Sequence, residues 1–145
     1  MISLSKAASI SELKILTLRE DFRPTVCYWL EEALKAGINP YIYEGFRSRA
    51  RQDELYAIGR TAPGKIVTQA KAGQSFHNYG LAFDWVPLRL VEKADGMYEA
   101  DWDNKSAYNT GAKIAAQLRL RSLSWETPHL EDARFANWRE LAAHS

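Results

Sequence analysis

The segment Ser75–Asp84 constrains this chain most, because it combines a turn, a strand and two potential metal ligands. It reads Ser-Phe-His-Asn-Tyr-Gly-Leu-Ala-Phe-Asp. Asn78 and Gly80 are typical turn residues, so we expect His77 in a turn. Bulky and small or polar residues then alternate, which predicts a strand with Asp84 on the face opposite the bulky row. The segment therefore predicts an imidazole and a carboxylate near one end of a sheet.

A second polar pair follows later in the chain, where Glu126-Thr-Pro-His129 carries another imidazole. Two histidines and one carboxylate form a typical three-ligand zinc set that leaves a fourth position for water. We therefore predict His77, Asp84 and His129 as ligands of one zinc ion. Glu126 is the candidate base that activates the water. Glu131 is the alternative base, since in a strand it would share the face of His129.

The pattern Ser-x-His-x-x-Gly-x-Ala-x-Asp, followed by an acid-x-x-His, resembles a known family of zinc peptidases. That family contains D-alanyl-D-alanine carboxypeptidases and dipeptidases and the phage L-alanyl-D-glutamate endolysins. The segments Glu44–Tyr56 and Gly59–Thr68 are most similar to the endolysin branch. The resemblance implies a Hedgehog/DD-peptidase-like fold, one Zn2+ and bacterial peptidoglycan stem peptides as substrate.

The same resemblance implies roles for three further polar residues. Arg47 is expected either to stabilise a developing oxyanion or to bind a substrate carboxylate. Ser75 is expected to bind substrate or to orient a ligand, and Gln52 to do similar work from a helix. Each of these side chains could instead have an ordinary structural role in a turn or on a helix surface.

The bond that is cleaved stays open at this level. The segment Leu118–Trp125 is shorter than the Trp-Gly-Gly-Asp-Trp type segment of the endolysins, and the acid Glu126 resembles the dipeptidase relatives. The resemblance implies an L-alanyl-D-glutamate endopeptidase that takes part in phage lysis. The alternatives are a D-alanyl-D-alanine carboxypeptidase or dipeptidase, and a metal-bearing cell-wall binding module without catalysis.

Length and composition favour a single folded domain that spans residues 1–145. The chain is 46% hydrophobic and has five Trp, seven Tyr and five Phe, so it can build a core. Helical and strand patterns mix without regular alternation, which predicts an α+β fold with a small, mainly antiparallel sheet and flanking helices. A formal net charge of +1 argues against a dedicated nucleic-acid binder.

Charge and cysteine usage add two expectations. Residues 47–71 carry six Lys or Arg against two acidic residues, and could meet an anionic cell-wall polymer or form an ordinary solvated surface. Cys27 is the only cysteine, which excludes an intrachain disulfide. Its helical phase with Leu30 and Leu34 predicts a buried thiol.

Targeting signals are not evident in the sequence. We find no apolar run of signal-peptide or membrane-span length. We therefore expect a monomer that is made in the cytoplasm without stable membrane insertion and acts on the cell wall after release.

The remaining patterns predict the order of elements along the chain. We expect a helix within residues 1–20 with Ile10, Leu13 and Leu16 inward, a helix from Pro24 to Gly37, a strand over 41–44, a helix over 48–58, a loop over 60–74, a strand ending near Pro87, a polar loop around Asp95-Gly96, a helix over 105–118, a strand from Arg119 into the site, and a short closing helix.

Overall fold

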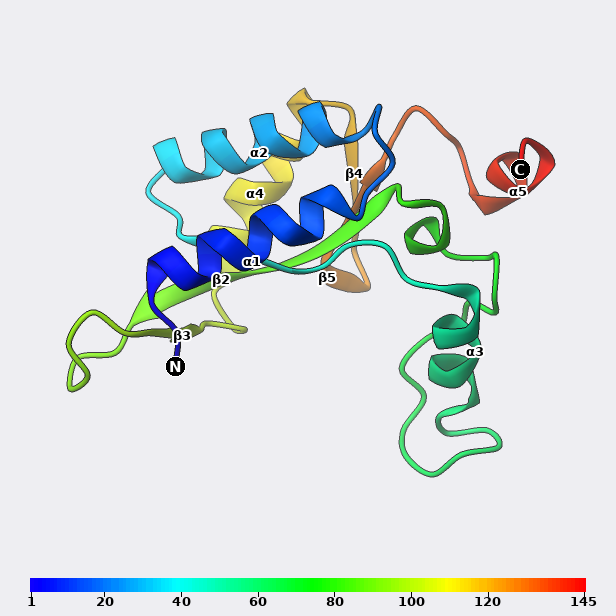
Figure 1. The fold of residues 1–145 in the computed structure, drawn as a ribbon, viewed down its shortest axis with the longest axis horizontal. Coiled ribbons are helices and arrows are strands. Elements are labelled where there is room, and N and C mark those ends of the chain that lie inside the picture. The colour runs from blue at the N-terminus through cyan, green and yellow to red at the C-terminus, as the bar shows by residue number, and fades with distance from the viewer.

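The chain folds into a small antiparallel sheet flanked by helices, as the computed structural model of residues 1–145 shows (Figure 1). The elements are α1 (Leu4–Leu16), α2 (Arg23–Lys35), β1 (Pro40–Glu44), α3 (Arg49–Ala57), the 3-10 helix η1 (Phe76–Tyr79), β2 (Ala82–Leu90), β3 (Tyr98–Ala100), α4 (Lys105–Gln117), β4 (Leu120–Leu123), β5 (Glu126–Asp132) and α5 (Trp138–Ala143). The strand order is β1-β2-β5-β4, with β3 also paired to β2, and all these pairs are antiparallel. The predicted α+β fold is confirmed. None of the helices has the length and apolar character needed to cross a membrane.

The core lies where α2 and α4 cover the sheet. Trp29 of α2 meets Phe83 and Trp85 of β2 edge to face, with ring centroids 5.2 and 4.8 Å apart. The Trp29 indole N–H donates a 3.0 Å hydrogen bond to the Gly111 carbonyl of α4. A Cβ at Gly111 would lie 2.5 Å from a ring carbon of Trp85, so only glycine lets α4 come this close. In Figure 1, α3, η1 and α5 instead gather at the end where β2 begins.

Helix α1 buries a different face from the one we predicted. Ala7, Ser11 and Ile15 point inward, whereas Leu13 and Leu16 are exposed. The small residues let α1 approach β1, an edge strand. The Ser11 hydroxyl there accepts a 3.0 Å hydrogen bond from a buried main-chain N–H of β1. A buried N–H without a partner is costly. Satisfying it with Ser11 therefore stabilises the fold more than burying the more apolar face of α1 would.

Helix α2 begins with Pro24 in its first turn and is followed by Gly37, as predicted. Its buried residues are Val26, Trp29 and Ala33, so the stripe is rotated by about one position. Cys27 is exposed, and the prediction of a buried thiol is wrong. The large Trp29 determines which face of the helix enters the core.

The strand predictions need two corrections. Strand β2 continues past Pro87 to Leu90 and pairs with the unpredicted β3. The proline is tolerated because Pro87 lies opposite Pro40 of β1, where neither residue can donate to the ladder. The region after Arg119 is not one strand leading into the site but the hairpin β4–β5, which turns at residues 124–125.

Candidate metal centre

Three elements bring the predicted ligands together. Asp84 of β2 lies directly opposite His129 of β5 in the antiparallel ladder, so both side chains project from one face. His77 lies on η1, just before β2. Gly80 ends η1 with a φ of +70°, and a Cβ there would lie 2.7 Å from the main-chain nitrogen of Arg19. The glycine of the motif is therefore required for η1 to turn into β2.

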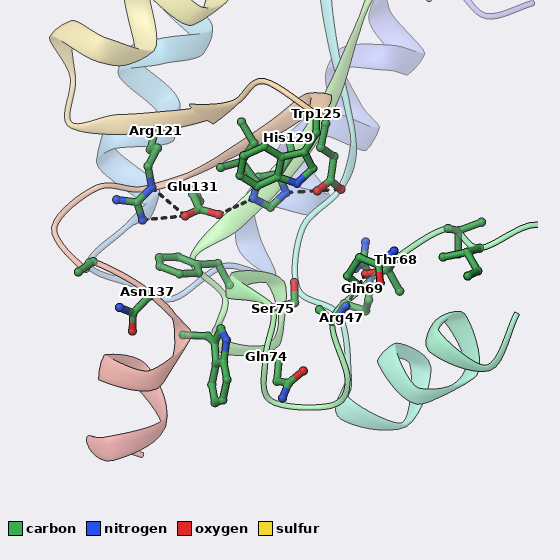
Figure 2. A pocket seen from close by; sticks show the side chains of 18 residues that line it. Arg47, Thr68, Gln69, Gln74, Ser75, Arg121, Trp125, His129, Glu131 and Asn137 are labelled. Carbon is green, nitrogen blue, oxygen red and sulfur yellow. Dashed lines mark hydrogen bonds and ion pairs between the residues drawn. The ribbon is translucent and has the colours of Figure 1, made fainter. Parts of the chain in front are cut away.

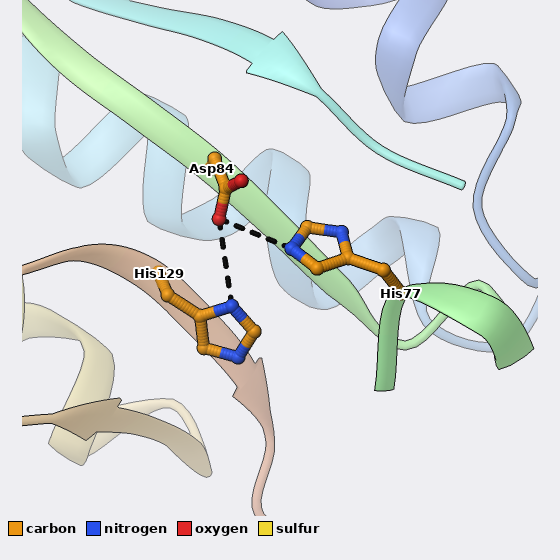
Figure 3. Close-up of side chains that lie close together, drawn as sticks. All are labelled: His77, Asp84 and His129. Carbon is orange, nitrogen blue, oxygen red and sulfur yellow. Dashed lines mark hydrogen bonds and ion pairs between the residues drawn. The ribbon is translucent and has the colours of Figure 1, made fainter. Parts of the chain in front are cut away.

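Ligand atoms of the three side chains all lie within 4.8 Å of one another (Figure 3). Asp84 Oδ1 is 3.1 Å from His77 Nε2 and 3.4 Å from His129 Nδ1. All three residues are buried. Three buried ligand atoms at this separation are positioned to bind one metal ion.

The hydrogen bonds of the two imidazoles support this fit. His77 Nδ1 lies 2.8 Å from the Gly45 carbonyl, which can only accept, so Nδ1 carries the proton and Nε2 faces the centre. His129 Nε2 lies 2.8 Å from Glu131 Oε1, which leaves Nδ1 facing the centre. This Nδ1 is buried and has no hydrogen-bond partner. A metal ion would satisfy the unpaired nitrogen, and two imidazoles with one carboxylate suit a tetrahedral site with one open position.

Electrostatics favour the ionised carboxylate. Burial raises the pKa of Asp84, but the neighbouring His129 and His77 outweigh this and hold its pKa well below the usual range. Burial lowers the pKa of His129, but the nearby carboxylates of Asp84 and Glu131 outweigh burial and raise its pKa to about 9. Because the raised pKa favours the protonated imidazole, a metal ion at His129 competes with a proton for the ring.

Arg47 lies beside the centre in a network of its own. Its guanidinium forms a bidentate pair with Glu44 at 2.7 and 2.8 Å, and Nη2 lies 3.6 Å from Asp84 Oδ2. Arg47 Nη1 donates a 2.9 Å hydrogen bond to Gln52, whose own amide donates to the Ala70 carbonyl at 2.8 Å. Gln52 is wholly buried and lies behind Arg47. It supports the wall of the site, while Arg47 forms part of that wall.

The two candidate bases occupy different sides of His129. Glu126 Oε1 lies 4.0 Å from His129 Nδ1, the nitrogen that faces the centre, and the Glu126 side chain is half exposed. Glu131 contacts the opposite nitrogen and pairs with Arg121 at 2.7 Å. Burial raises the pKa of Glu131, but its bonds to His129 and Arg121 lower it overall. Glu126 alone combines solvent access with proximity to the metal-facing nitrogen.

The centre opens into a groove of about 570 Å³ (Figure 2). Arg47, Ser75, Glu126 and His129 all line it. Ser75 also caps η1, since its hydroxyl accepts from the His77 N–H at 3.2 Å. The other walls are loop 66–70 and residues 136–138, on opposite sides of the centre.

Trp125, expected from the sequence as part of the core or of a cleft wall, lines the groove. Other groove residues had no recognisable signal in the sequence. Arg121, Asn137 and Trp138 reach the groove because the β4–β5 hairpin and the C-terminal segment fold back beside η1. A pattern of local spacing cannot report such convergence. Trp125 is largely exposed at the tip of the hairpin.

Comparisons with known proteins agree with this geometry. The profile of the VanY family, D-alanyl-D-alanine carboxypeptidase, matches residues 16–131. The peptidoglycan L-alanyl-D-glutamate endopeptidase CwlK of Bacillus subtilis is 41% identical over 116 residues, covering 69% of this chain and 67% of the relative.

Two solved structures share the fold. The L-Ala D-Glu endopeptidase ChiX of Serratia marcescens has a TM-score of 0.55 at 21% identity, over 85% of this chain and 86% of that chain. The vancomycin resistance D,D-pentapeptidase VanY, in complex with Zn(II), has a TM-score of 0.57 at 16% identity, over 80% of this chain and 72% of that chain. With the match of residues 16–131 to the family profile, these likenesses lead to one conclusion: the chain belongs to the VanY family of peptidases.

Proposed function

We propose that this chain is a zinc-dependent peptidase that hydrolyses the L-alanyl-D-glutamate bond of peptidoglycan stem peptides. The observation that carries the proposal is the His77–Asp84–His129 centre, whose buried, unpaired Nδ1 faces Glu126 in an open groove. The 41% identity to an enzyme named for this bond supports the substrate.

Glu126 acts as the general base and then as the general acid. A bound zinc ion would supply Lewis acidity, which lowers the pKa of a water and polarises the substrate carbonyl. Glu126 takes a proton from the attacking water, whose oxygen adds to the L-alanine carbonyl carbon. When the C–N bond breaks, Glu126 passes that proton to the leaving D-glutamate nitrogen. Water is consumed, and a carboxyl group and an amine are released.

Arg47 supplies a fixed positive charge at the wall of the groove. Glu44 and Gln52 hold its guanidinium in one orientation, so little reorganisation is needed as negative charge develops on the substrate. Burial lowers the pKa of Arg47, but its pairing with Glu44 outweighs burial and raises it. We assign to Arg47 the stabilisation of the oxyanion and to Gln52 the positioning of Arg47. Ser75 holds η1 and forms part of the substrate wall.

The shape and charge of the groove support an internal scissile bond. Loop 66–70 and residues 136–138 border the groove on opposite sides of the centre, so a peptide can continue in both directions (Figure 2). A carboxypeptidase needs a free cation to bind the terminal carboxylate. The two arginines of the groove, Arg47 and Arg121, are already paired with Glu44 and Glu131. These pairings favour the endopeptidase over a D-alanyl-D-alanine carboxypeptidase or dipeptidase.

We further propose that the protein is a bacteriolytic enzyme of the phage endolysin type. In this proposal residues 1–145 form one catalytic domain that acts as a monomer. It acts on the wall after release from the cytoplasm, since peptidoglycan lies outside the inner membrane. The similarity of Glu44–Tyr56 and Gly59–Thr68 to the endolysin branch supports this assignment.

The deciding experiment is mass spectrometry of purified peptidoglycan after digestion with zinc-loaded protein. New N-terminal D-glutamate and free L-alanine carboxyl ends are expected. Released D-alanine or D-alanyl-D-alanine would refute the endopeptidase assignment and show a carboxypeptidase or dipeptidase instead. Intact stem peptides from several wall types, with zinc bound to the protein, would refute catalysis. The cell-wall binding module would then be the remaining hypothesis.

A further inference from the structure

Glu131 is a buried carboxylate that the proposed reaction does not use. One oxygen lies 2.8 Å from His129 Nε2. The other accepts two hydrogen bonds from Arg121, at 3.0 and 2.7 Å. Both oxygens are thus engaged, and both face away from the nitrogen that would bind metal. A carboxylate so fully engaged cannot also move a proton at the centre.

Arg121 connects this carboxylate to two further parts of the site. It lies opposite Glu131 in the β4–β5 ladder. Its Nη2 also donates a 2.8 Å hydrogen bond to the Phe135 carbonyl, just before the groove residues 136–138. Its guanidinium stacks on the ring of Phe76, 5.4 Å from the centroid, and Phe76 precedes His77. Arg121 therefore contacts the carboxylate beside His129, the ring that precedes His77, and the main chain where the groove wall begins.

The two histidines are held by different kinds of group. A main-chain carbonyl, that of Gly45, orients His77, and no side-chain substitution removes it. A side-chain carboxylate orients His129. The group that orients His129 can therefore be removed by mutation and its effect on metal affinity measured, whereas the group that orients His77 cannot.

We propose that Glu131 and Arg121 form a positioning pair that fixes the ring and the metal-binding tautomer of His129 and connects it to the groove wall. Glu131 holds the proton on Nε2, so Nδ1 is the nitrogen left for the metal. Arg121 keeps the carboxylate in place. This inference rests on the proposed metal site but not on the identity of the cleaved bond.

The test compares zinc affinity, by competition with a chromophoric chelator, in wild type, Glu131→Ala, Glu131→Gln and Arg121→Ala. Loss of a group that orients a metal-bound histidine typically lowers metal affinity about 10- to 100-fold, which we expect for Glu131→Ala. Glu131→Gln should lose less, because its amide oxygen still accepts from Nε2. Arg121→Ala should lose less than Glu131→Ala. The visible spectrum of the cobalt-loaded protein should change in Glu131→Ala.

A control is Glu99→Ala on β3, which breaks a cross-strand pair of the same type, with Arg89 at 2.8 Å, on the exposed part of the sheet away from the centre. It should bind zinc as the wild type does. A purely structural role for Glu131 would lower the melting temperature of the apo protein and leave zinc affinity and the cobalt spectrum unchanged, and that result would overturn the proposal.

The two proposals can fail separately. If Glu131→Ala does not fold, Glu131→Met decides, because methionine keeps most of the volume but offers no oxygen to His129 Nε2. Zinc affinity equal to wild type in Glu131→Met would refute the positioning pair. If the Glu131 and Arg121 variants lose zinc affinity as expected but the wild type does not cleave peptidoglycan, the proposed function is refuted and the positioning pair stands. A wild type with no zinc affinity would overturn both.

Discussion

Replacing Gln52 by alanine should destabilise the protein and disturb the groove without removing the metal. Gln52 is wholly buried, and both ends of its amide are hydrogen-bonded, to Arg47 at 2.9 Å and to the Ala70 carbonyl at 2.8 Å. The bond from the charged Arg47 contributes about 1.5–3 kcal/mol and the neutral bond about 0.5–1.5 kcal/mol. We therefore expect the free energy of unfolding to fall by about 2–4.5 kcal/mol.

Urea unfolding followed by circular dichroism measures this loss. Gln117→Ala is the matched control, because Gln117 is exposed at the end of α4, and its change should stay within about 0.5 kcal/mol. Gln52→Met keeps most of the volume and separates the lost hydrogen bonds from the cavity. Arg47 and Ala70 both line the groove, so kcat/KM on stem peptides should fall while zinc affinity is retained. A Gln52→Ala protein as stable as the Gln117→Ala control would refute this account of the network.

Three further predictions follow from the site and the core. Glu126→Gln should keep wild-type zinc affinity and lose about 10²- to 10⁴-fold in kcat, measured by chelator competition and by peptide release; full activity would exclude Glu126 as the base. The pKa of His129, raised from the ordinary histidine value of 6.5 to about 9, contributes stability to the metal-free protein that is complete below pH 6.5 and is lost as the pH rises through 9. Apparent zinc affinity should rise over the same range as the proton leaves, and a flat pH profile in a zinc titration would contradict this. Gly111→Ala should lower the free energy of unfolding by about 1–3 kcal/mol, because its Cβ would lie 2.5 Å from Trp85; a gain in thermal stability would mean that helix propensity outweighs the clash.

Local rules predicted much of this molecule because the relevant contacts are close in sequence. Ser48 caps α3 through the Arg51 N–H, and Gly80 provides the left-handed turn between η1 and β2. The alternation around Asp84 identified β2 and the unusual carboxylate on it. Residues a few positions apart determine such features, so no knowledge of the rest of the chain is required.

The identity of the three residues at the metal centre was also predictable, since imidazole and carboxylate side chains are typical metal ligands. The orientation of these side chains was not predictable from the sequence. His129 turns Nδ1 rather than Nε2 toward the centre, and its Nε2 lies against Glu131. Sequence spacing left Glu131 as a rival base, and its contact with the far side of the ring is the observation behind the positioning role that we propose for it.

Packing between distant segments decided the rest. The inward face of α1 follows from a hydrogen bond between Ser11 and β1, and that of α2 from the fit of Trp29 against the sheet, which leaves Cys27 exposed. The groove wall likewise depends on Arg121 reaching the Phe135 carbonyl. The amino-acid sequence determines which groups are available and how each short segment turns. Only the packed structure determines which buried polar groups find partners, because that depends on segments that meet from far apart in the chain.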